Sequence, residues 1–464
     1  MKTSDPICIE IESPPAPEAV FRALADDPYP FFLDSALRMP RVGRYSFIGG
    51  DPFLVMLAHG STMEYRSDSE RRFREGDPFS LLRRELNRCA VTPHPDAPFT
   101  GGAVGYFGYD LGRFIEQLPC TTLDDIRFPD LYMAFYDGAI VYDHATGRAW
   151  AAGCDVVDGR PPARERVARL IERIRANPPS STEDEGTVGE VTCNFTREEY
   201  LQALQRVKDY IAAGDIFQAN LSRRFETRLA VRPAELYRRL RRINPTPMAA
   251  YLAFDDCAVV SASPERFLRV RGWRVETRPI KGTRPRGADE ASDEALAEEL
   301  LHSEKDNAEL AMIVDLERND LGRVCSYGSV RVTEPRVLES FPTVHHLVAT
   351  VEGELHDGHD RIDLLRASFP GGSITGAPKI RAMEIIDELE PTRRALYTGA
   401  IGYLGFDGGM DLSIVIRTFL MRGDRVWFQA GGGIVADSAC VSEYEETRDK
   451  ARALIHAVSG GAAH

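Results

Sequence analysis

The feature that most constrains this chain is a run of four short strand patterns separated only by turns. They cover residues 249–254, 258–262, 266–270 and 273–277, and Arg271-Gly272 is typical of a hairpin turn. Two helical patterns follow directly, at 292–302 and 304–321. Because strands and helices come in blocks rather than in strict alternation, the sequence favours an α+β fold over a doubly wound one.

Further elements are predicted on both sides of this run. A capping box begins at Thr196, and the helix behind it ends at Gly214. Later we expect strands at 216–225, 400–406, 413–421 and 425–430 and a last helix at 443–458. Earlier we expect strands at 54–58 and 139–142, a strand entering a loop at 101–110, and a helix at 161–176.

Length and composition predict more than one structural unit. The chain has 464 residues, of which 43% are hydrophobic, enough for two to three domain-sized units. Residues 177–186 contain proline, serine and acid and nothing apolar, which indicates a linker or surface loop. We therefore predict an N-terminal region at 1–175, a linker at 176–190 and a C-terminal region at 191–460.

Charge and cysteine usage exclude several classes of protein. The net charge of −14 argues against a nucleic-acid partner, although a few buried cations can still bind a small anion. The N-terminus lacks an apolar signal core, and no stretch is long enough to span a bilayer, so we expect no membrane partner. Eight scattered cysteines without a C-x-x-C motif suit a reducing cytoplasm rather than a disulfide framework or zinc site.

A lysine stands where protein scaffolds usually place reactive groups. Lys281 follows the predicted strand at 273–277 and lies between Pro279 and Gly282. An amine is nucleophilic only when neutral, so its reference pKa of about 10.4 must be lowered by burial or by nearby cations. On these residues alone, a solvated lysine in a basic loop is the alternative.

Two predicted helices each carry a pair of carboxylates three residues apart. Asp306 and Glu309 share one helix face, and Glu443 and Glu446 share another. If the pairs converge, they need a cation, and oxygen ligands without His or Cys suit Mg²⁺. Residues 442–445 also form a capping-box pattern, so the end of a helix is the alternative explanation for Glu443.

Ten segments, in a fixed order, carry a resemblance to a known family. They are 214–218 (GDIFQ), 263–267 (SPERF), 278–287 around Lys281, 312–323 (MIVDLERNDLGR), 344–348 (VHHLV), 369–379 (FPGGSITGAPK), 397–399 (YTG), 416–418 (IRT), 430–435 (AGGGIV) and 442–450 (SEYEETRDK). Together they resemble the chorismate-utilising enzymes over about residues 190–460 and, with fewer matches, over the first region.

The resemblance implies a fold and a set of site residues. The fold is two packed antiparallel β-sheets flanked by helices, an α/β/β/α layered sandwich, with a first region of the anthranilate synthase component I type. The implied metal is Mg²⁺, with the ligands Glu309, Glu446, Asp306 and Glu443; Asp306 replaces the Glu that is usual in anthranilate synthases. The implied substrate-binding residues are Arg417, Tyr397, Ser373, Gly432, Gly433 and Lys450, and the implied acid/base residues are Glu265 and His346.

Within this family, two positions bear on the reaction. Lys281 stands in Pro-Ile-Lys-Gly-Thr where anthranilate synthases have alanine, and this form resembles aminodeoxychorismate synthases, in which the lysine adds to chorismate and ammonia then displaces it. Gln218 stands where isochorismate and salicylate synthases carry a water-activating lysine. The alternatives are an anthranilate synthase component I with an unusual lysine and a non-catalytic binding subunit.

Two further features concern partners and regulation. No cysteine lies in a Gly-x-Cys-x-Gly nucleophile turn, so ammonia is expected from solution or from a separate glutamine amidotransferase subunit. Residues 33–35 and 244–248 partly resemble segments of relatives that are feedback-inhibited by tryptophan, although Met248 and the prolines are more simply explained as loop and core residues.

Overall fold

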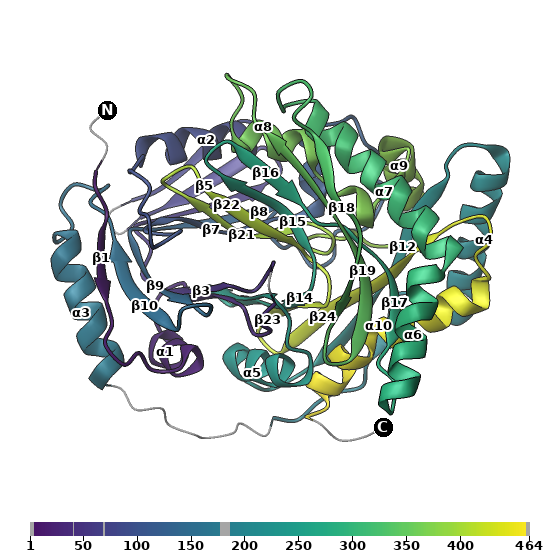
Figure 1. The fold of residues 1–464 in the computed structure, drawn as a ribbon, viewed down its shortest axis with the longest axis horizontal. Helices are drawn as coiled ribbons and strands as arrows, with labels where there is room; N and C mark the ends of the chain where they lie inside the picture. The colour runs from purple at the N-terminus through teal and green to yellow at the C-terminus, as the bar shows by residue number, and fades with distance from the viewer. Residues whose placement is uncertain (1–3, 40, 68–69, 177–185, 461–464) are drawn as a thin grey trace.

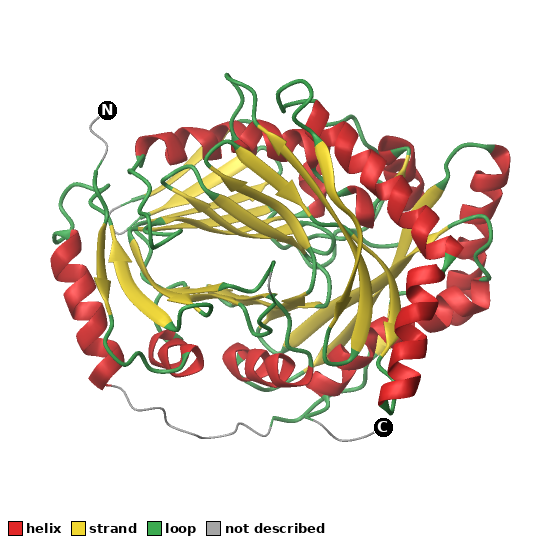
Figure 2. Ribbon diagram, viewed as in Figure 1, coloured by secondary structure: helices red, strands yellow, loops and turns green. Residues whose placement is uncertain are grey.

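The computed structural model describes residues 4–39, 41–67, 70–176 and 186–460. Two large sheets lie face to face, with helices on the outer sides of both (Figure 1). Colouring by element type makes the layers visible (Figure 2). The predicted α+β class and the α/β/β/α layering are confirmed, whereas residues 177–185 of the predicted linker lie outside the described residues.

Both sheets are antiparallel and contain strands from both sequence regions. In spatial order the first sheet contains β1 (Ile7–Glu10), β10 (Arg148–Gly153), β9 (Gly138–Asp143), β3 (Tyr45–Gly49), β2 (Phe31–Asp34), β13 (Met248–Phe254), β14 (Cys257–Ser263), β23 (Thr418–Arg422), β24 (Arg425–Ile434), β12 (Gln218–Arg228) and β11 (Thr192–Cys193), and β20 (Gly376–Ala377) pairs with β12. The second contains β17 (Ile280–Pro285), β19 (Val344–Glu354), β16 (Arg274–Thr277), β15 (Arg266–Arg271), β22 (Met410–Ile414), β21 (Ala400–Gly405), β7 (Gly102–Phe107), β8 (Leu131–Tyr136), β4 (Leu54–His59), β5 (Thr62–Arg66) and β6 (Arg71–Glu75), and β18 (Arg331–Ser340) pairs with β19. Because β2 pairs with β13 and β7 with β21, the two regions build the same two sheets.

Helices cover the outer faces. Those against the first sheet are α1 (Pro17–Leu24), α3 (Ala163–Ala176), α4 (Arg197–Ala213), α5 (Pro233–Ile243), α9 (Lys379–Leu389) and α10 (Cys440–Val458). Those on the side of the second sheet are α2 (Pro78–Arg88), α6 (Glu290–His302), α7 (Glu304–Gly322) and α8 (Arg361–Ser368). The short turn η1 (Tyr109–Phe114) lies between β7 and β8, and η2 (Gly372–Ile374) lies between α8 and β20. None of the helices among the described residues combines the length and hydrophobicity that crossing a membrane requires.

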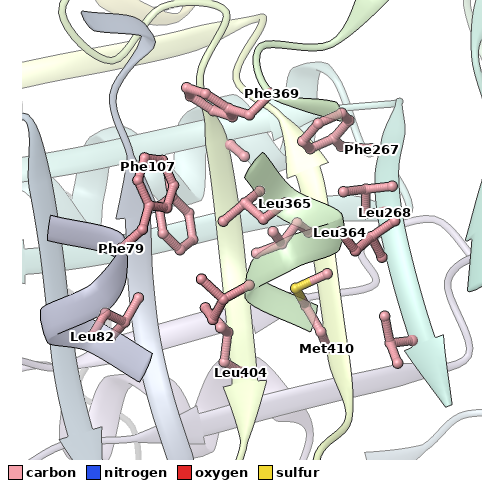
Figure 3. Packing of buried hydrophobic residues seen from close by; sticks show 14 of the residues in the cluster. Phe79, Leu82, Phe107, Phe267, Leu268, Leu364, Leu365, Phe369, Leu404 and Met410 are labelled. Atoms are coloured by element: carbon pink, nitrogen blue, oxygen red, sulfur yellow. The ribbon is translucent and has the colours of Figure 1, made fainter. Parts of the chain in front are cut away.

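Separate apolar layers hold the sandwich together. Aromatic and branched side chains such as Phe31, Tyr106 and Trp427 fill the space between the sheets. On the outer face of the second sheet, Phe79 of α2 and Leu365 of α8 pack in one cluster with sheet residues (Figure 3). Each fully buried side chain of this kind stabilises the fold by about 1.5–3 kcal/mol, so the helices stay on the sheets because their apolar faces are buried there.

Several local predictions are confirmed. Thr196 and Glu199 form the capping box of α4, and Gly214 ends that helix in the left-handed conformation. The hairpin between β15 and β16 turns at Gly272, whose φ is +58°, a value that glycine adopts without strain. Trp273, which was predicted to begin a strand, lies in this turn and is 60% exposed.

Two predictions are wrong for identifiable reasons. The predicted strand at 413–421 is two strands, because β22 ends in the second sheet at Ile414 and β23 begins in the first sheet at Thr418. The chain crosses between the sheets there, with Arg417 at a φ of +53°. The predicted capping box at 442–445 is also absent: α10 begins earlier, and Glu443 instead accepts a hydrogen bond from Ser438 Oγ at 2.6 Å.

Candidate active site

Lys281 lies inside a strand rather than after one, as the sequence had predicted. It occupies β17 opposite Leu347 of β19, and the pairing shifts by one residue before Thr283 meets His346. Gly282 forms this bulge with a φ of +77°. A bulge re-aims the neighbouring side chains, and here Lys281 turns toward β24 and η2.

The amine of Lys281 and the carboxyl of Glu265 are linked through one residue. Lys281 Nζ donates to the backbone oxygen of Ser373 at 3.0 Å, and Ser373 Oγ donates to Glu265 Oε1 at 2.6 Å. Burial lowers the pKa of Lys281, against the opposing effect of Glu309 and Glu265. Burial also raises the pKa of Glu265 to about 7. Burial therefore shifts the amine toward its neutral form, and this amine lies beside a carboxyl that can give up or take a proton near neutral pH.

His346 is a buried, neutral imidazole. Its Nδ1 lies 3.0 Å from Thr283 Oγ1, and its ring packs edge-on against Phe341 at 5.0 Å between centroids. Burial, and then the nearby Arg417, lower the pKa of His346 to about 3. An imidazole with this pKa is neutral at pH 7, so it can hydrogen-bond to a ligand but does not act there as a cation.

Two glycines of β24 keep the space beside the lysine open. A Cβ at Gly433 would lie 2.4 Å from Gln218 Nε2 and 3.4 Å from Lys281 Nζ. A Cβ at Gly432 would lie 3.4 Å from Glu443 Oε2 and 3.6 Å from Lys450 Nζ. Any side chain at Gly433 would collide with its neighbours, so the backbone itself forms this wall of the site.

The predicted acidic residues lie on α7 and α10, but the structure does not draw them into one ligand set. Burial raises the pKa of Glu309 and of Glu443, and neighbouring carboxylates add to both shifts. Glu446 instead pairs with Lys450 at 2.6 Å, which lowers its pKa. Asp306 pairs with Arg284 at 3.0 Å. Among the described residues, no three His, Cys, Asp or Glu side chains are grouped closely enough to hold a metal.

Arg417 is a cation that faces the site without a protein partner. It is half-buried, and within the part of the chain that the structure describes its guanidinium makes no hydrogen bond or ion pair. Tyr397 lies near it, and burial raises the pKa of this phenol to about 12. A free guanidinium next to a neutral phenol provides donors that suit a carboxylate.

The buried ion pair of Arg394 and Glu390 lies next to Tyr397, with the Arg394 guanidinium 5.7 Å from the centroid of the tyrosine ring. Arg394 donates to Glu390 at 2.7 Å, to the backbone oxygen of Asn220 at 2.5 Å and to that of Ile374 at 3.2 Å. Glu390 in turn accepts from the Ser222 N–H at 2.8 Å. With these bonds the pair joins β12, η2 and the segment after α9, so its polar atoms are satisfied although they are buried.

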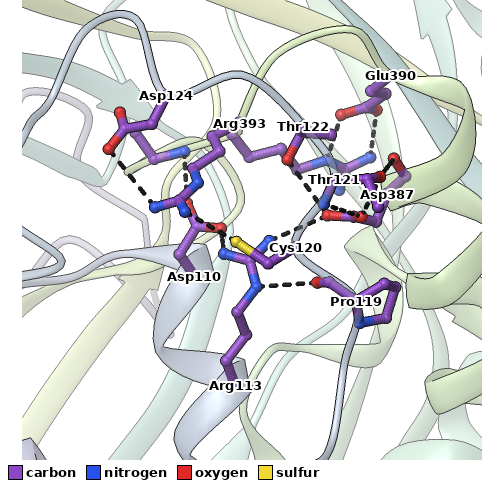
Figure 4. Close-up of polar contacts among 12 residues, drawn as sticks. Asp110, Arg113, Pro119, Cys120, Thr121, Thr122, Asp124, Asp387, Glu390 and Arg393 are labelled. Atoms are coloured by element: carbon purple, nitrogen blue, oxygen red, sulfur yellow. Dashed lines mark hydrogen bonds and ion pairs between the residues drawn. The ribbon is translucent and has the colours of Figure 1, made fainter. Parts of the chain in front are cut away.

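The first sequence region reinforces the same segment. Asp387, near the end of α9, accepts hydrogen bonds from the Thr121 N–H at 2.9 Å and from Arg113 Nη2 at 3.0 Å (Figure 4). Thr121 and Arg113 come from the loop and η1 turn that follow β7. The N-terminal region therefore holds the backbone that carries Tyr397, although it supplies none of the predicted site residues.

Comparison with known proteins identifies the family of this chain. The model of the chorismate binding enzyme family matches residues 43–456. The chain belongs to this family. It is 43% identical to aminodeoxychorismate synthase component 1 of Bacillus subtilis, with 91% of each chain covered, and 45% identical to anthranilate synthase component 1 of Thermus thermophilus, with 95% of each covered. Its fold matches the crystal structure of anthranilate synthase component I from Streptococcus pneumoniae with a TM-score of 0.80 and 33% identity, over 90% of this chain and 92% of that one.

Sequence reasoning missed one candidate residue of this chorismate-binding enzyme. Asn220 lies two residues after Gln218 on β12, so its side chain points to the same face, and it pairs with Gly433. It is 7% exposed, and its Nδ2 has no hydrogen-bond partner among the described residues. Its side chain also lies close enough to Tyr397 to influence the pKa of that phenol. The alternation from Gln218 is the sequence signal that could have identified it.

The two segments that resembled tryptophan-binding relatives meet at one cavity. Leu33, Asp34 and Ser35 line a cavity of about 270 Å³ together with Pro247 and Met248. Five arginines, Arg41, Arg44, Arg266, Arg269 and Arg271, also border it. The partial resemblance to relatives that tryptophan inhibits therefore falls on residues that line one cavity.

Proposed function

We propose that this chorismate-binding enzyme is an aminodeoxychorismate synthase component I, which converts chorismate and ammonia to 4-amino-4-deoxychorismate. Overall sequence identity does not distinguish between the two reactions, because an aminodeoxychorismate synthase and an anthranilate synthase are 43% and 45% identical to this chain. The observation that supports the proposal is the placement of Lys281, whose buried amine is joined through Ser373 to Glu265. Anthranilate synthases have alanine at this position by resemblance, and an alanine cannot act as a nucleophile.

The proposed reaction has two substitutions. Neutral Lys281 attacks C2 of the chorismate ring, both ring double bonds shift by one position, and the 4-hydroxyl leaves as water with a proton from Glu265. Ammonia then adds at C4, both double bonds shift back, and the C2–N bond breaks so that Lys281 leaves as the neutral amine. The proton that the added ammonia loses goes to the Glu265 carboxylate, so both residues are regenerated and the net products are aminodeoxychorismate and water.

The other predicted residues would hold the substrate. Arg417, Tyr397 and the N–H groups around Gly432 and Gly433 would bind a carboxylate, with Ser373 next to the ring and Lys450 adding positive charge. His346 would hydrogen-bond to the substrate as a neutral imidazole and complete the predicted acid/base set with Glu265.

We further propose that Mg²⁺ is the cofactor. The buried carboxylates of Glu309 and Glu443 have raised pKa values, as expected for oxygens that a divalent cation would stabilise. Glu309, Glu443 and Glu446 would be ligands once their side chains move closer together than they lie in this structure, and Asp306, now paired with Arg284, would join through its second oxygen or a water. When bound, Mg²⁺ would clamp a substrate carboxylate and orient the ring.

A glutamine amidotransferase subunit is the proposed partner. The names of the relatives, component 1, point to a second component, and this chain has no glutaminase nucleophile turn of its own. The isolated chain should therefore use ammonium salts directly. An anthranilate synthase component I is the second candidate, supported by the 45% identity to the Thermus thermophilus protein.

The covalent step provides the test. Incubation with chorismate and Mg²⁺ but without ammonia should leave an adduct of dehydrated chorismate on Lys281, seen by intact-mass and peptide mass spectrometry. Lys281→Ala should lose both the adduct and aminodeoxychorismate formation, and Lys281→Arg should not restore them, because a guanidinium stays protonated. Lys208→Arg, on α4, is the matched control for the arginine variant and should behave like the unmodified enzyme, because it keeps a cationic donor to the Ser438 backbone oxygen that Lys208 Nζ contacts at 2.5 Å. Full activity of Lys281→Ala, with no adduct on the unmodified enzyme, would contradict the proposal.

A further inference from the structure

A buried carboxyl group holds the turn that carries Ser373. Glu317 lies on α7 and is only 2% exposed. Its Oε1 accepts a hydrogen bond from the Gly372 N–H at 3.2 Å, and its Oε2 accepts one from Thr277 Oγ1 at 3.5 Å. The Glu317 side chain therefore links α7 to the end of β16 and to η2, the turn whose Ser373 contacts Lys281 and Glu265.

The contact between α7 and η2 is close. A Cβ on Gly372 would lie 2.6 Å from Leu316 Cδ2 and 3.3 Å from Glu317 Oε1. Only a bare backbone lets the Gly372 amide approach the carboxyl, so the hydrogen bond and the glycine depend on each other. A displaced Glu317 would release this peptide from the helix.

The turn matters because Ser373 positions two groups at once. Its backbone oxygen holds the amine of Lys281 at 3.0 Å, and its hydroxyl holds the carboxyl of Glu265 at 2.6 Å. A shift of the Gly372–Ser373 unit would move both groups relative to each other. Misplacement by about 1 Å can slow a reaction about 100-fold.

We propose that Glu317 is a positioning residue that fixes the Gly372–Ser373 unit and thereby sets Lys281 and Glu265 at their working geometry. The proposal rests on the proposed function, because it takes Lys281 and Glu265 as the reacting groups. Burial, and then Asp320, raise the pKa of Glu317 to about 8 against the lowering effect of Lys379, which favours the neutral acid. A neutral acid holds the Gly372 N–H with a carbonyl oxygen, and a glutamine side chain offers the same acceptor.

Three variants test this role. Glu317→Gln keeps the acceptor, and Glu317→Leu fills the space without it. Asp315→Asn changes an exposed carboxylate on the same helix, which pairs only with Arg318 among the described residues. Circular dichroism and thermal unfolding would establish folding, and Glu317→Met, which is more flexible, would replace the leucine variant if that variant does not fold.

Two measurements distinguish a misplaced Lys281 and Glu265 from a general loss of folded structure. The first is kcat and KM for chorismate. The second is the acetylation rate of Lys281 relative to Lys208 in the same molecule, followed by peptide mass spectrometry, which reports the surroundings of the amine whatever the product.

We expect Glu317→Leu to lower kcat about 10- to 100-fold, with KM changed less than about threefold, and to change the acetylation ratio. Glu317→Gln and Asp315→Asn should stay within about threefold of the unmodified enzyme in both readouts. Unchanged readouts in the leucine variant would overturn the proposal, as would a glutamine variant as slow as leucine, which would point to a role for the proton. If the unmodified enzyme makes no aminodeoxychorismate, the proposed function fails, while the acetylation ratio still tests Glu317.

Discussion

Burial brings the pKa of Glu265 close to neutral pH. An exposed glutamate is ionised at pH 7, but this carboxyl is 4% exposed, and its pKa rises to about 7 against the lowering effect of Ser373 and Lys281. Such a pKa leaves both protonation states populated at neutral pH. In the proposed reaction, the protonated form releases the 4-hydroxyl, and the ionised form then takes a proton from the incoming nitrogen.

The pH dependence follows from this value. If Glu265 must be protonated and Lys281 neutral, kcat/KM for chorismate should fall about tenfold per pH unit above both pH ~7 and the pKa of Lys281, since only the loss of the acid form then changes the rate. The profile should be measured at a constant concentration of free NH₃, because the fraction of NH₃ itself rises with pH.

The control is Glu265→Gln, which cannot ionise. We expect its rate to be lower by about 100-fold or more, and its profile to lack the fall above neutral pH. An equally steep fall in the glutamine variant would assign that limb to another group.

At the scale of elements, β24 and β12 form the wall on which the site is built. Gly432 and Gly433 on β24 lie opposite Leu221 and Asn220 on β12, and they leave room for Lys281, Gln218 and Lys450. This open space exists because the two glycines carry no side chain where the nearest atoms belong to the polar side chains of Gln218, Lys281, Glu443, Glu446 and Lys450.

Gly433→Ala should therefore block the site without unfolding the protein. Its methyl group would meet Gln218 Nε2 at 2.4 Å and Lys281 Nζ at 3.4 Å, so side chains must move away from it. We expect turnover to fall at least about tenfold, with a melting temperature within a few degrees of the unmodified enzyme. Gly322→Ala, where nothing lies within 4 Å of the added methyl, is the control. Normal turnover in Gly433→Ala would show that the ring does not bind against this wall.

Short sequence patterns correctly predicted several helix ends and turns. Thr196, Gly214 and Gly272 set their helix ends and turn as expected, because caps and left-handed turns depend on adjacent residues. The break at Arg417 was missed, since the strand pattern continues across the point where the chain changes sheets. The pairing of Asp306 with Arg284 and the free amide of Asn220 depend on contacts between distant elements, which periodicity does not report.

At the scale of the whole molecule, both sequence regions serve one site. The predicted catalytic residues all come from the second region, but the first supplies five of the twelve strands of each sheet and holds α9 through Thr121 and Arg113. The family and the layered fold could be predicted because many motifs share one order along the chain. The sequence could not predict that both regions contribute strands to both sheets, because pairing between strands far apart in the sequence leaves no local pattern.

Product analysis tests the central claim most directly. The purified chain should be incubated with chorismate, Mg²⁺ and an ammonium salt, and the products separated by chromatography and identified by mass. We expect 4-amino-4-deoxychorismate, no product with glutamine in place of ammonium, and no product after Mg²⁺ is removed by a chelator. Anthranilate as the main product, or unchanged chorismate under all conditions, would contradict the account.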